Sequence, residues 1–383
     1  MGQALHPGSE AELSDIIRSL EAPVEIVSAG TKRGLGHPVQ AAATLDMSGF
    51  AGIIAYEPEE LILEAGAATP LAEVEALIAA RGQQLAFEPP DYSGLLGSAH
   101  SGTLAGLVSC NLSGPRRIKS GAVRDQILGL RGVTGRGDIF KAGARVVKNV
   151  TGYDLPKLLT GSYGTLAALT SVILKVLPAP ETEETVALTG LDDTAAVAAM
   201  SLAMQSPWEV SSAAHIPGQA VYLRLEGIAP SVAYRRDQLA RTLGTPVEVM
   251  AARSSAGLWR SLRDVAMFAE TPRHPLWRIS VAPTDASEVI QKLYGSIDFR
   301  YFFDWAGGLI WLQVAPSADA SAALVRAAVG RGHATLVRAP DATRAAAGVF
   351  QPQAEALAAL SGRVRDAFDP RHIFNPGRMY RGH

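Results

Sequence analysis

The first thirty residues carry two hydrophobic patterns in succession. Leu13 and Ile17 lie one helical turn apart, among other apolar residues at the same spacing. Ser9 precedes them and Glu12 follows it by three residues, which is the capping-box arrangement that begins a helix. Residues 24–28 then form an apolar run that is too short for a helix. The pattern therefore predicts a helix followed by a buried strand.

Short apolar runs continue through the first half of the chain and predict further strands. These lie at residues 44–46, 53–56, 61–65, 84–87, 126–130 and 169–174. One helix interrupts them: Thr69 is placed to cap it, Pro70 to occupy its first position and Gly82 to end it. The first half therefore predicts sheets connected by short helices.

The second half repeats one pattern twice. Residues 185–250 and 276–338 each alternate as strand, helix, strand, strand, helix, strand, the order of a ferredoxin-like unit. In the second unit, Gly307-Gly308 predicts a two-residue hairpin turn. A proline-rich, acidic stretch at 178–184 marks a boundary before the repeats. We predict domains at 1–178 and 179–350, with a helix and an apolar tail at 351–383 that pack back on the first domain.

Glycines cluster where the predicted strands end. Residues 29–36, AGTKRGLG, directly follow the strand at 24–28, and a loop of this kind can bind an anion through backbone N–H groups. The dinucleotide fingerprint and the P-loop both fail here, because Pro38 follows the glycines and no Gly-Lys-Ser/Thr is present. The loop taken alone is equally well explained as an ordinary turn.

The stretch 102–176 has the densest glycine clusters. Gly102, Gly106 and Gly114 lie in its first part, and Gly161 and Gly164 lie in its last. Glycine lets the backbone approach a phosphate or a flat ring closely. These clusters predict a ligand site, although a turn-rich sheet would also use glycines in this way.

Composition and charge restrict the class of protein. The chain has 383 residues, of which 48% are hydrophobic and 19% are charged, so a large core can form. Its net charge of −2 argues against nucleic-acid binding through a general positive field. Cys110 is the single cysteine, which excludes a disulfide framework or a cysteine-ligated cluster. No signal peptide or membrane span is evident, so we expect a cytoplasmic protein that reaches a membrane only through partners.

Three motifs give these observations a family resemblance. They are VKNVTGYDL at 147–155, GSYGTL at 161–166 and FNPGRMY at 374–380. Together with the loop at 29–36, which precedes them in the sequence, these motifs resemble those of the FAD-binding family of vanillyl-alcohol oxidase and p-cresol methylhydroxylase (PCMH). Within it the chain is most similar to the subunit-E group, the FAD-binding subunits of bacterial glycolate oxidase (glycolate dehydrogenase). The resemblance implies an α+β protein, with a PCMH-type FAD-binding domain of two subdomains followed by a cap of two ferredoxin-like units.

The resemblance also implies a set of cofactor-binding residues. It assigns pyrophosphate and flavin contacts to the loop and the first glycine cluster, and contacts near the adenosine half to the last. The implied residues are Ala29, Gly30, Thr31, Lys32, Arg33, Gly34, Leu35, Pro90, Gly102, Thr103, Leu104, Gly106, Asn111, Ser113, Gly114, Gly164, Thr165 and Leu166. No catalytic residue is assigned and no metal is expected.

Departures from the family affect the expected chemistry. Relatives with covalent flavin carry a linking histidine or cysteine, whereas this loop has no histidine and Cys110 resembles a small buried residue, so we expect non-covalent FAD. Relatives that oxidise 2-hydroxy acids carry histidines about where Trp305 and Trp311 stand. Indole only donates a hydrogen bond, whereas imidazole can accept a proton. Histidines 215, 274 and 333 have no ligand spacing and are interpreted as structural.

Arginines provide the remaining candidate groups. Arg116 and Arg117 could bind a phosphate or the acidic patch of a partner. Arg273-His274 and Arg278 could face a carboxylate substrate, but a solvated face of the cap explains them better.

Three functions fit the sequence. In the first, the chain is an accessory or electron-relaying FAD subunit that works with a catalytic flavin subunit and an iron–sulfur subunit to oxidise glycolate to glyoxylate. The iron–sulfur centre must lie in another polypeptide, because Cys110 alone cannot ligate one. In the second, it is a stand-alone flavin oxidoreductase for another hydroxylated substrate. In the third, it is a structural subunit with a redox-inactive flavin site.

Overall fold

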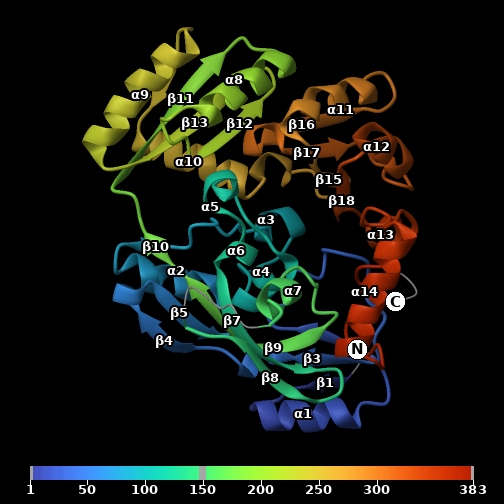
Figure 1. Cartoon of the computed structure of the whole chain (residues 1–383). Coiled ribbons are helices and arrows are strands. Elements are labelled where there is room, and N and C mark those ends of the chain that lie inside the picture. Colours follow the sequence, from blue (N-terminus) through green and yellow to red (C-terminus); the bar gives the residue numbers. More distant parts are fainter. Residues whose placement is uncertain (1–2, 146–151, 381–383) are drawn as a thin grey trace. The chain divides into compact units, whose positions relative to one another are not determined.

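Two compact units divide the chain in a computed structural model that describes residues 3–145 and 152–380. Unit 1 consists of Met1–Leu112, Ala122–Pro178 and Pro352–His383. Unit 2 consists of Ser113–Gly121 and Ala179–Gln351. The short segment Ser113–Gly121 therefore leaves unit 1 for unit 2 and returns. Figure 1 labels the elements of both units.

A small parallel sheet begins unit 1. It is formed by β1 (Gln3–Leu5), β3 (Ala43–Asp46) and β2 (Val24–Val27), in that order. Helix α1 (Glu10–Ser19) begins after Ser9, whose hydroxyl accepts the backbone N–H of Glu12 at 3.2 Å, as the sequence predicts. Leu13 and Ile17 of α1 are fully buried in one cluster with Phe374 from the far end of the chain.

A five-stranded antiparallel sheet forms the second layer of unit 1, in the order β4-β5-β9-β7-β8 within the described residues. Its strands are β4 (Ile53–Glu57), β5 (Ile62–Gly66), β7 (Ile127–Thr134), β8 (Ile139–Gly143) and β9 (Ala167–Lys175). The central strand β9 is buried from Ala167 to Leu174, a run that is apolar on both faces except at Thr170 and Ser171. The strands β6 (Gln83–Gln84) and β10 (Leu177–Pro178) pair with each other in a separate two-stranded antiparallel sheet.

Short helices connect these strands. The helical segments of unit 1 are η1 (Met47–Gly49), η2 (Pro58–Glu60), α2 (Leu71–Ala79), α3 (Ser93–Leu96), α4 (Leu104–Cys110), α6 (Val123–Gln126), α7 (Leu155–Leu159) and α14 (Glu355–Phe368). Beyond α14 the tail joins the first layer, where Val24 bridges Phe374 in parallel and Asn375 N donates to Val24 O at 3.0 Å.

One antiparallel sheet of eight strands spans unit 2, in the order β14-β11-β13-β12-β16-β17-β15-β18. The strands are β11 (Thr182–Thr189), β12 (Ser212–Ile216), β13 (Ala220–Gly227), β14 (Glu248–Met250), β15 (Leu276–Ser280), β16 (Phe299–Asp304), β17 (Leu309–Val314) and β18 (His333–Arg338). Each half has the order β-α-β-β-α-β, which agrees with the repeat in the sequence. The halves meet where His215 of β12 pairs with Phe303 of β16.

The helices of unit 2 account for its core. They are α5 (Arg117–Ser120), α8 (Asp193–Gln205), α9 (Ala229–Leu243), α10 (Ala252–Arg263), η3 (Ala266–Phe268), η4 (Pro283–Asp285), α11 (Ala286–Leu293), η5 (Trp305–Gly307), α12 (Ala322–Val329) and α13 (Asp341–Ala346). Residues from α8, α9, α11 and α12 share one hydrophobic cluster with alternate residues of the sheet, including Trp277 and Leu312. The period-two alternation of the strands thus forms one buried layer.

Three local predictions are wrong. The hairpin at Gly307-Gly308 is a four-residue connection, because η5 occupies Trp305–Gly307 before β17 begins. Thr69 does not cap α2; its hydroxyl donates to Gly66 O at 2.7 Å, and Pro70 occupies the capping position. The strand predicted at 84–87 is confined to Gln83–Gln84.

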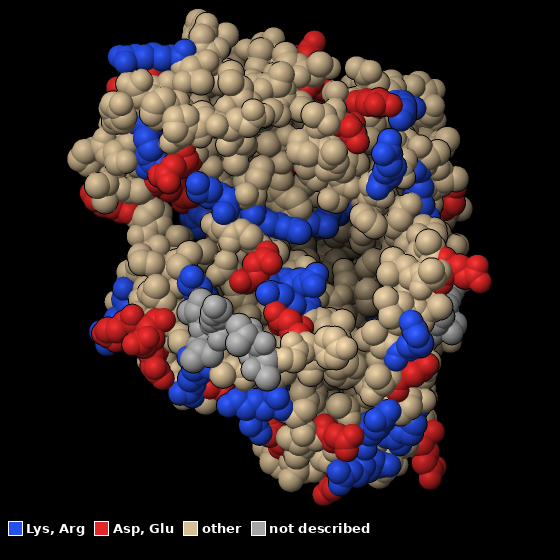
Figure 2. Space-filling view, viewed as in Figure 1, with Lys and Arg blue, Asp and Glu red and all other residues tan. Residues whose placement is uncertain are grey.

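One of the three family motifs is only partly covered by the structure. Residues 147–151 of VKNVTGYDL lie outside the described residues. None of the described helices is long and apolar enough to cross a membrane. Figure 2 shows basic and acidic side chains interspersed on the visible face, in keeping with a net charge of −2.

Candidate functional site

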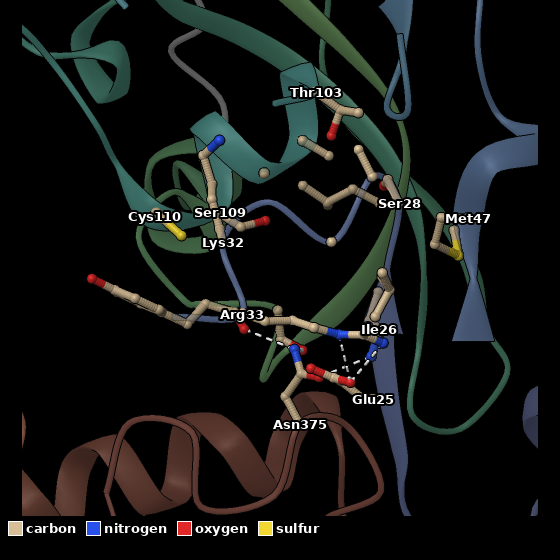
Figure 3. A pocket seen from close by; sticks show the side chains of 18 of the residues that line it. Glu25, Ile26, Ser28, Lys32, Arg33, Met47, Thr103, Ser109, Cys110 and Asn375 are labelled. Atoms are coloured by element: carbon tan, nitrogen blue, oxygen red, sulfur yellow. Dashed lines mark hydrogen bonds and ion pairs between the residues drawn. The ribbon is translucent and has the colours of Figure 1, made fainter. Parts of the chain in front are cut away.

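The loop that follows β2 lines a cavity of about 90 Å³ in unit 1. This loop, the Ser28–Arg33 loop, meets helix α4, the start of β9 and the tail around the cavity (Figure 3). The lining residues are Glu25, Ile26, Val27, Ser28, Ala29, Gly30, Thr31, Lys32, Arg33, Met47, Thr103, Ala105, Gly106, Ser109, Cys110, Tyr163, Gly164, Ala167, Leu169, Asn375 and Arg378.

Lys32 provides the positive charge of this cavity. Its ammonium lies 3.4 Å from Thr31 Oγ1, and its side chain runs beside Ser109 and Cys110 in Figure 3. Burial lowers the pKa of Lys32 from its ordinary value, and the opposing effects of Cys110 and Asp91 are smaller. A cation desolvated in this way is stabilised by an anionic ligand.

Glycines make room for the Lys32 side chain. A Cβ at Gly102 would lie 2.0 Å from Lys32 Nζ, and one at Gly106 would lie 3.3 Å from Lys32 Cδ. Such contacts require glycine at Gly102, or a different course for the lysine. The residues present therefore form a cradle of small size, with a cation and a hydroxyl, and this set of groups fits a diphosphate.

Two arginines fix the base of the loop. Arg33 pairs with Glu25 at 3.0 Å, and Arg378 reaches the same carboxylate at 3.4 Å. Arg378 also donates to Lys32 O at 2.8 Å and is 7% exposed. A residue of the tail thus positions the backbone that carries the lysine.

Asn375 joins three segments that lie far apart in the sequence. Its Oδ1 accepts the N–H of Ile26 at 2.8 Å, and its Nδ2 donates to Tyr163 O at 2.8 Å and Gly164 O at 3.3 Å. Gly164 has a φ of +69°, and a Cβ there would lie 2.7 Å from Asn375 Nδ2. Both backbone conformation and space therefore require glycine at this position.

Cys110 lies at the end of α4 and lines the same cavity. Burial raises the pKa of its thiol, and the nearby Lys32 and Arg378 only partly oppose this. A thiol held in its neutral form is a weak nucleophile. Cys110 is only partly buried by exposed area, so its environment agrees in part with the predicted small buried residue.

The sequence-predicted site residues divide into those that line the cavity and those that do not. The first group contains Ala29, Gly30, Thr31, Lys32, Arg33, Thr103, Gly106 and Gly164. Gly34 and Leu35 continue the loop, where Leu35 is buried. Gly102 lies against Lys32, and Leu104 is fully buried in α4.

The other predicted residues lie in different surroundings. Asn111 ends α4 with a φ of 49°, and Pro90 is buried in the loop before α3. Thr165 and Leu166 line a second cavity of unit 1. Ser113 and Gly114 belong to unit 2.

Sequence reasoning missed the tail residues Asn375 and Arg378 as parts of the site. The signal available was the motif FNPGRMY at 374–380, which contains both residues and marked the family but did not indicate that their side chains reach the loop. Glu25 was missed for a similar reason, since a charged residue within a strand is usually assigned to its solvated face.

In unit 2, Trp305 makes close contacts with two arginines. The guanidinium carbons of Arg117 and Arg278 lie 4.4 and 4.9 Å from the centroid of the Trp305 ring, and Trp305 Nε1 donates to Gly114 O at 3.1 Å. Arg116 pairs with Glu226 at 2.7 Å, with both side chains largely buried. Arg116 is therefore bound within this chain.

Comparison with known proteins settles the family. The chain is 35% identical to "Glycolate oxidase subunit GlcE" of Escherichia coli (strain K12) over 378 residues, which cover 97% of each chain. The chain belongs to the GlcE family. The family model "FAD binding domain" matches residues 3–143, so this GlcE-family member is an FAD-dependent oxidoreductase subunit with FAD as its cofactor.

Two further matches extend this result. "Glycolate oxidase subunit GlcD" of Bacillus subtilis (strain 168) is 42% identical over 99 residues, or 26% of this chain and 20% of that protein. The structure of p-cresol methylhydroxylase with substrate bound superposes with a TM-score of 0.72 at 15% identity, covering 98% of this chain and 88% of that chain. The predicted PCMH-type α+β fold is thereby confirmed.

Proposed function

We propose that this chain is the FAD-binding subunit of a glycolate oxidase, which oxidises glycolate to glyoxylate in a complex. The observation that carries the proposal is full-length similarity to a glycolate oxidase subunit, together with a cavity whose groups suit a diphosphate. Bound FAD would supply the capacity to accept two electrons. The complex would be cytoplasmic and would associate with the membrane only through its partners.

The Ser28–Arg33 loop would hold the FAD pyrophosphate, with Lys32, Thr31 and Thr103 as its polar groups. The remaining unit 1 residues implied by the family resemblance would line the flavin and the adenosine half. We propose that FAD is bound non-covalently, because the loop contains no histidine and burial keeps the Cys110 thiol protonated.

Acid precipitation of the purified protein tests the mode of attachment. We expect yellow FAD in the supernatant, with the mass of the intact cofactor, and a precipitated chain with its unmodified mass. A chain that carries an added flavin mass would contradict non-covalent binding. Mass spectrometry of the peptide containing Cys110 identifies the attachment point in that event.

The chemistry of Trp305 and Trp311 supports an accessory role. Trp311 is 2% exposed and stacks on Phe302, with ring centroids 6.5 Å apart. Trp305 uses its N–H on Gly114 O. Oxidation of a 2-hydroxy acid requires a base to accept the hydroxyl proton, and indole cannot serve as one. We therefore assign substrate oxidation to a partner flavin subunit and electron relay to this chain, with an iron–sulfur subunit as the third component.

Anaerobic stopped-flow mixing with glycolate tests this division of labour. The flavin band of the isolated, FAD-loaded chain should keep its absorbance, whereas the complex with its flavin and iron–sulfur partners should lose absorbance rapidly. Rapid bleaching in the isolated chain would refute the accessory role. A redox titration of the complex then separates an electron-relaying flavin from a structural one, since a relay flavin must be reduced within the working range of its partners.

A stand-alone oxidoreductase remains the second candidate, and one observation favours it. Arg278 stacks on Trp305 from the middle of β15, and its guanidinium is of the kind that binds a carboxylate. This candidate predicts that a hydroxylated acid other than glycolate bleaches the flavin of the isolated chain, and that Arg278→Met raises its KM. A panel of 2-hydroxy acids in the same stopped-flow assay decides between the two functions.

A further inference from the structure

Four polar side chains gather in unit 2 at the seam between the two halves of its sheet. Within the described residues, β12 and β16 pair there at the single position of His215 and Phe303. Asp193 in the first turn of α8 and His215 of β12 come from the first half. Tyr294 at the end of α11 and Tyr301 of β16 come from the second half (Figure 1). We call these four residues, without Phe303, the seam cluster.

The polar atoms of the seam cluster follow one another at short distances. His215 Nε2 lies 3.2 Å from Asp193 Oδ1, and Asp193 Oδ2 accepts the hydroxyl of Tyr301 at 2.5 Å. The hydroxyl oxygens of Tyr301 and Tyr294 are 3.4 Å apart. Atoms that bind one metal ion through bonds of about 2.0–2.1 Å lie about 2.8–3.4 Å from each other. The first and last spacings fall in this range, and the shorter one is a hydrogen bond that a metal ion would replace.

Hydrogen bonding within the seam cluster does not account for His215. Its side chain is 2% exposed, and neither ring nitrogen makes a hydrogen bond among the described residues, although Nε2 is close to Asp193. A buried polar group without a hydrogen bond is costly. Two atoms that bind a common ion show this combination of closeness and poor hydrogen-bond geometry, because each directs a lone pair at the ion and not at the other atom.

Asp193 is a largely buried carboxylate that has no basic side chain as a partner. Its side chain is 16% exposed, and no Lys or Arg within residues 3–145 and 152–380 comes within ion-pair distance of it. It is not needed to cap α8, because Asp192 Oδ1 accepts the N–H of Ala195 at 2.8 Å. A buried negative charge requires a compensating positive one, and a bound metal ion supplies such a charge.

We propose that the seam cluster binds ferric iron, with the Asp193 carboxylate, His215 Nε2 and both tyrosine oxygens as its ligands. Imidazole nitrogen suits iron, and the anionic oxygens add the negative charge that a trivalent ion needs. Binding releases the two phenol protons to solvent, so that one carboxylate and two phenolates balance the charge of Fe³⁺. Tyr294 is 61% exposed, which gives the ion an entry path. The bound ion joins the two halves of the sheet, and its role is structural.

Titration of the FAD-loaded protein with Fe³⁺, supplied as its nitrilotriacetate chelate, tests the proposal. We expect one iron per chain to stay with the protein through gel filtration, as measured by elemental analysis. The difference spectrum against the iron-free protein should show a charge-transfer band from phenolate to iron, which a surface-adsorbed ion would lack. The melting temperature should rise as the concentration of the chelate increases, because the ion binds the folded state.

Variants of the ligands locate the site. His215→Gln and Tyr301→Phe should each weaken iron binding at least about tenfold. Tyr294→Phe keeps the test independent of folding, because this tyrosine is exposed, and it should weaken both iron binding and the charge-transfer band.

Tyr222→Phe is the matched control for the tyrosine variants. The Tyr222 hydroxyl lies outside the seam cluster and contacts Gln219 at 3.3 Å, so this variant should bind iron as the wild type does. Failure of the protein to retain iron, retention without the charge-transfer band, or wild-type binding by Tyr294→Phe would each overturn the proposal.

Discussion

Gly164→Val should weaken both the fold of unit 1 and its hold on FAD. The glycine has a φ of +69°, which costs a β-branched residue about 1–3 kcal/mol. Its new Cβ would also lie 2.7 Å from Asn375 Nδ2 and displace an amide that joins three backbone segments. Leaving those groups unsatisfied costs about 1–3 kcal/mol more. We expect a total loss of roughly 2–6 kcal/mol in the free energy of unfolding.

A control variant separates backbone strain from the clash. Gly82 has a φ of +64° and nothing within 4 Å of an added Cβ, so Gly82→Val should be destabilised by backbone strain only, without a steric clash. Urea unfolding of both variants and FAD titration by fluorescence quenching give the comparison. We expect Gly164→Val to be less stable than Gly82→Val and to bind FAD at least about tenfold more weakly. Equal stability and wild-type FAD affinity in Gly164→Val would show that Asn375 does not hold this part of the site.

Two further predictions concern charged groups. Lys32→Met should weaken FAD binding. In the FAD-free protein, burial lowers the pKa of Lys32, so the stability of the wild type should rise relative to that of the variant as pH increases from this lowered pKa toward the unfolded value of about 10.4. Parallel stability curves for the two proteins from about pH 7 to 10 would contradict this. Arg116→Met should remove the 2.7 Å partner of buried Glu226, which keeps Arg224 at 3.7 Å, and should cost about 1.5–3 kcal/mol in urea unfolding. Arg33→Met, at a pair whose arginine is 53% exposed, should cost about 1 kcal/mol or less, and equal losses would show that burial does not govern these pairs.

Regular elements could be predicted from the sequence where hydrophobic periodicity and packing agree. The buried run of β9 and the capped start of α1 are of this kind, and the repeated strand and helix pattern of unit 2 reappears as two halves of one sheet. Local signals failed where tertiary contacts decided the backbone. Trp305 and Ala306 both have positive φ, and Trp305 is held by Asp304 and Gly114, neither of which a turn preference can indicate.

The candidate site was predictable to a similar extent. Glycine clusters and the family resemblance indicated the Ser28–Arg33 loop and Gly164. Where the backbone must approach a ligand or another segment closely, glycine is needed, and glycines are visible in the sequence. The roles of Asn375 and Arg378 depend on the tail returning across more than three hundred residues to β2, and no local pattern records that pairing. Arg116 was predicted to be available for a phosphate or a partner, but its acceptor is Glu226 of the same chain, more than a hundred residues away.

The tail in the core of unit 1 sets an order of events during protein synthesis. Phe374 is fully buried with Leu13 and Ile17, so the first layer of unit 1 cannot complete its core when residues up to Pro178 have left the ribosome. Nearly two hundred residues must follow, which takes about 10–40 s at about 5–20 residues per second. Throughout that interval the nascent chain exposes an apolar surface that awaits Phe374, while unit 2 is still being made. Recruitment of the cofactor is therefore expected to be post-translational, and the unfinished first layer is the part of the nascent chain most in need of a chaperone.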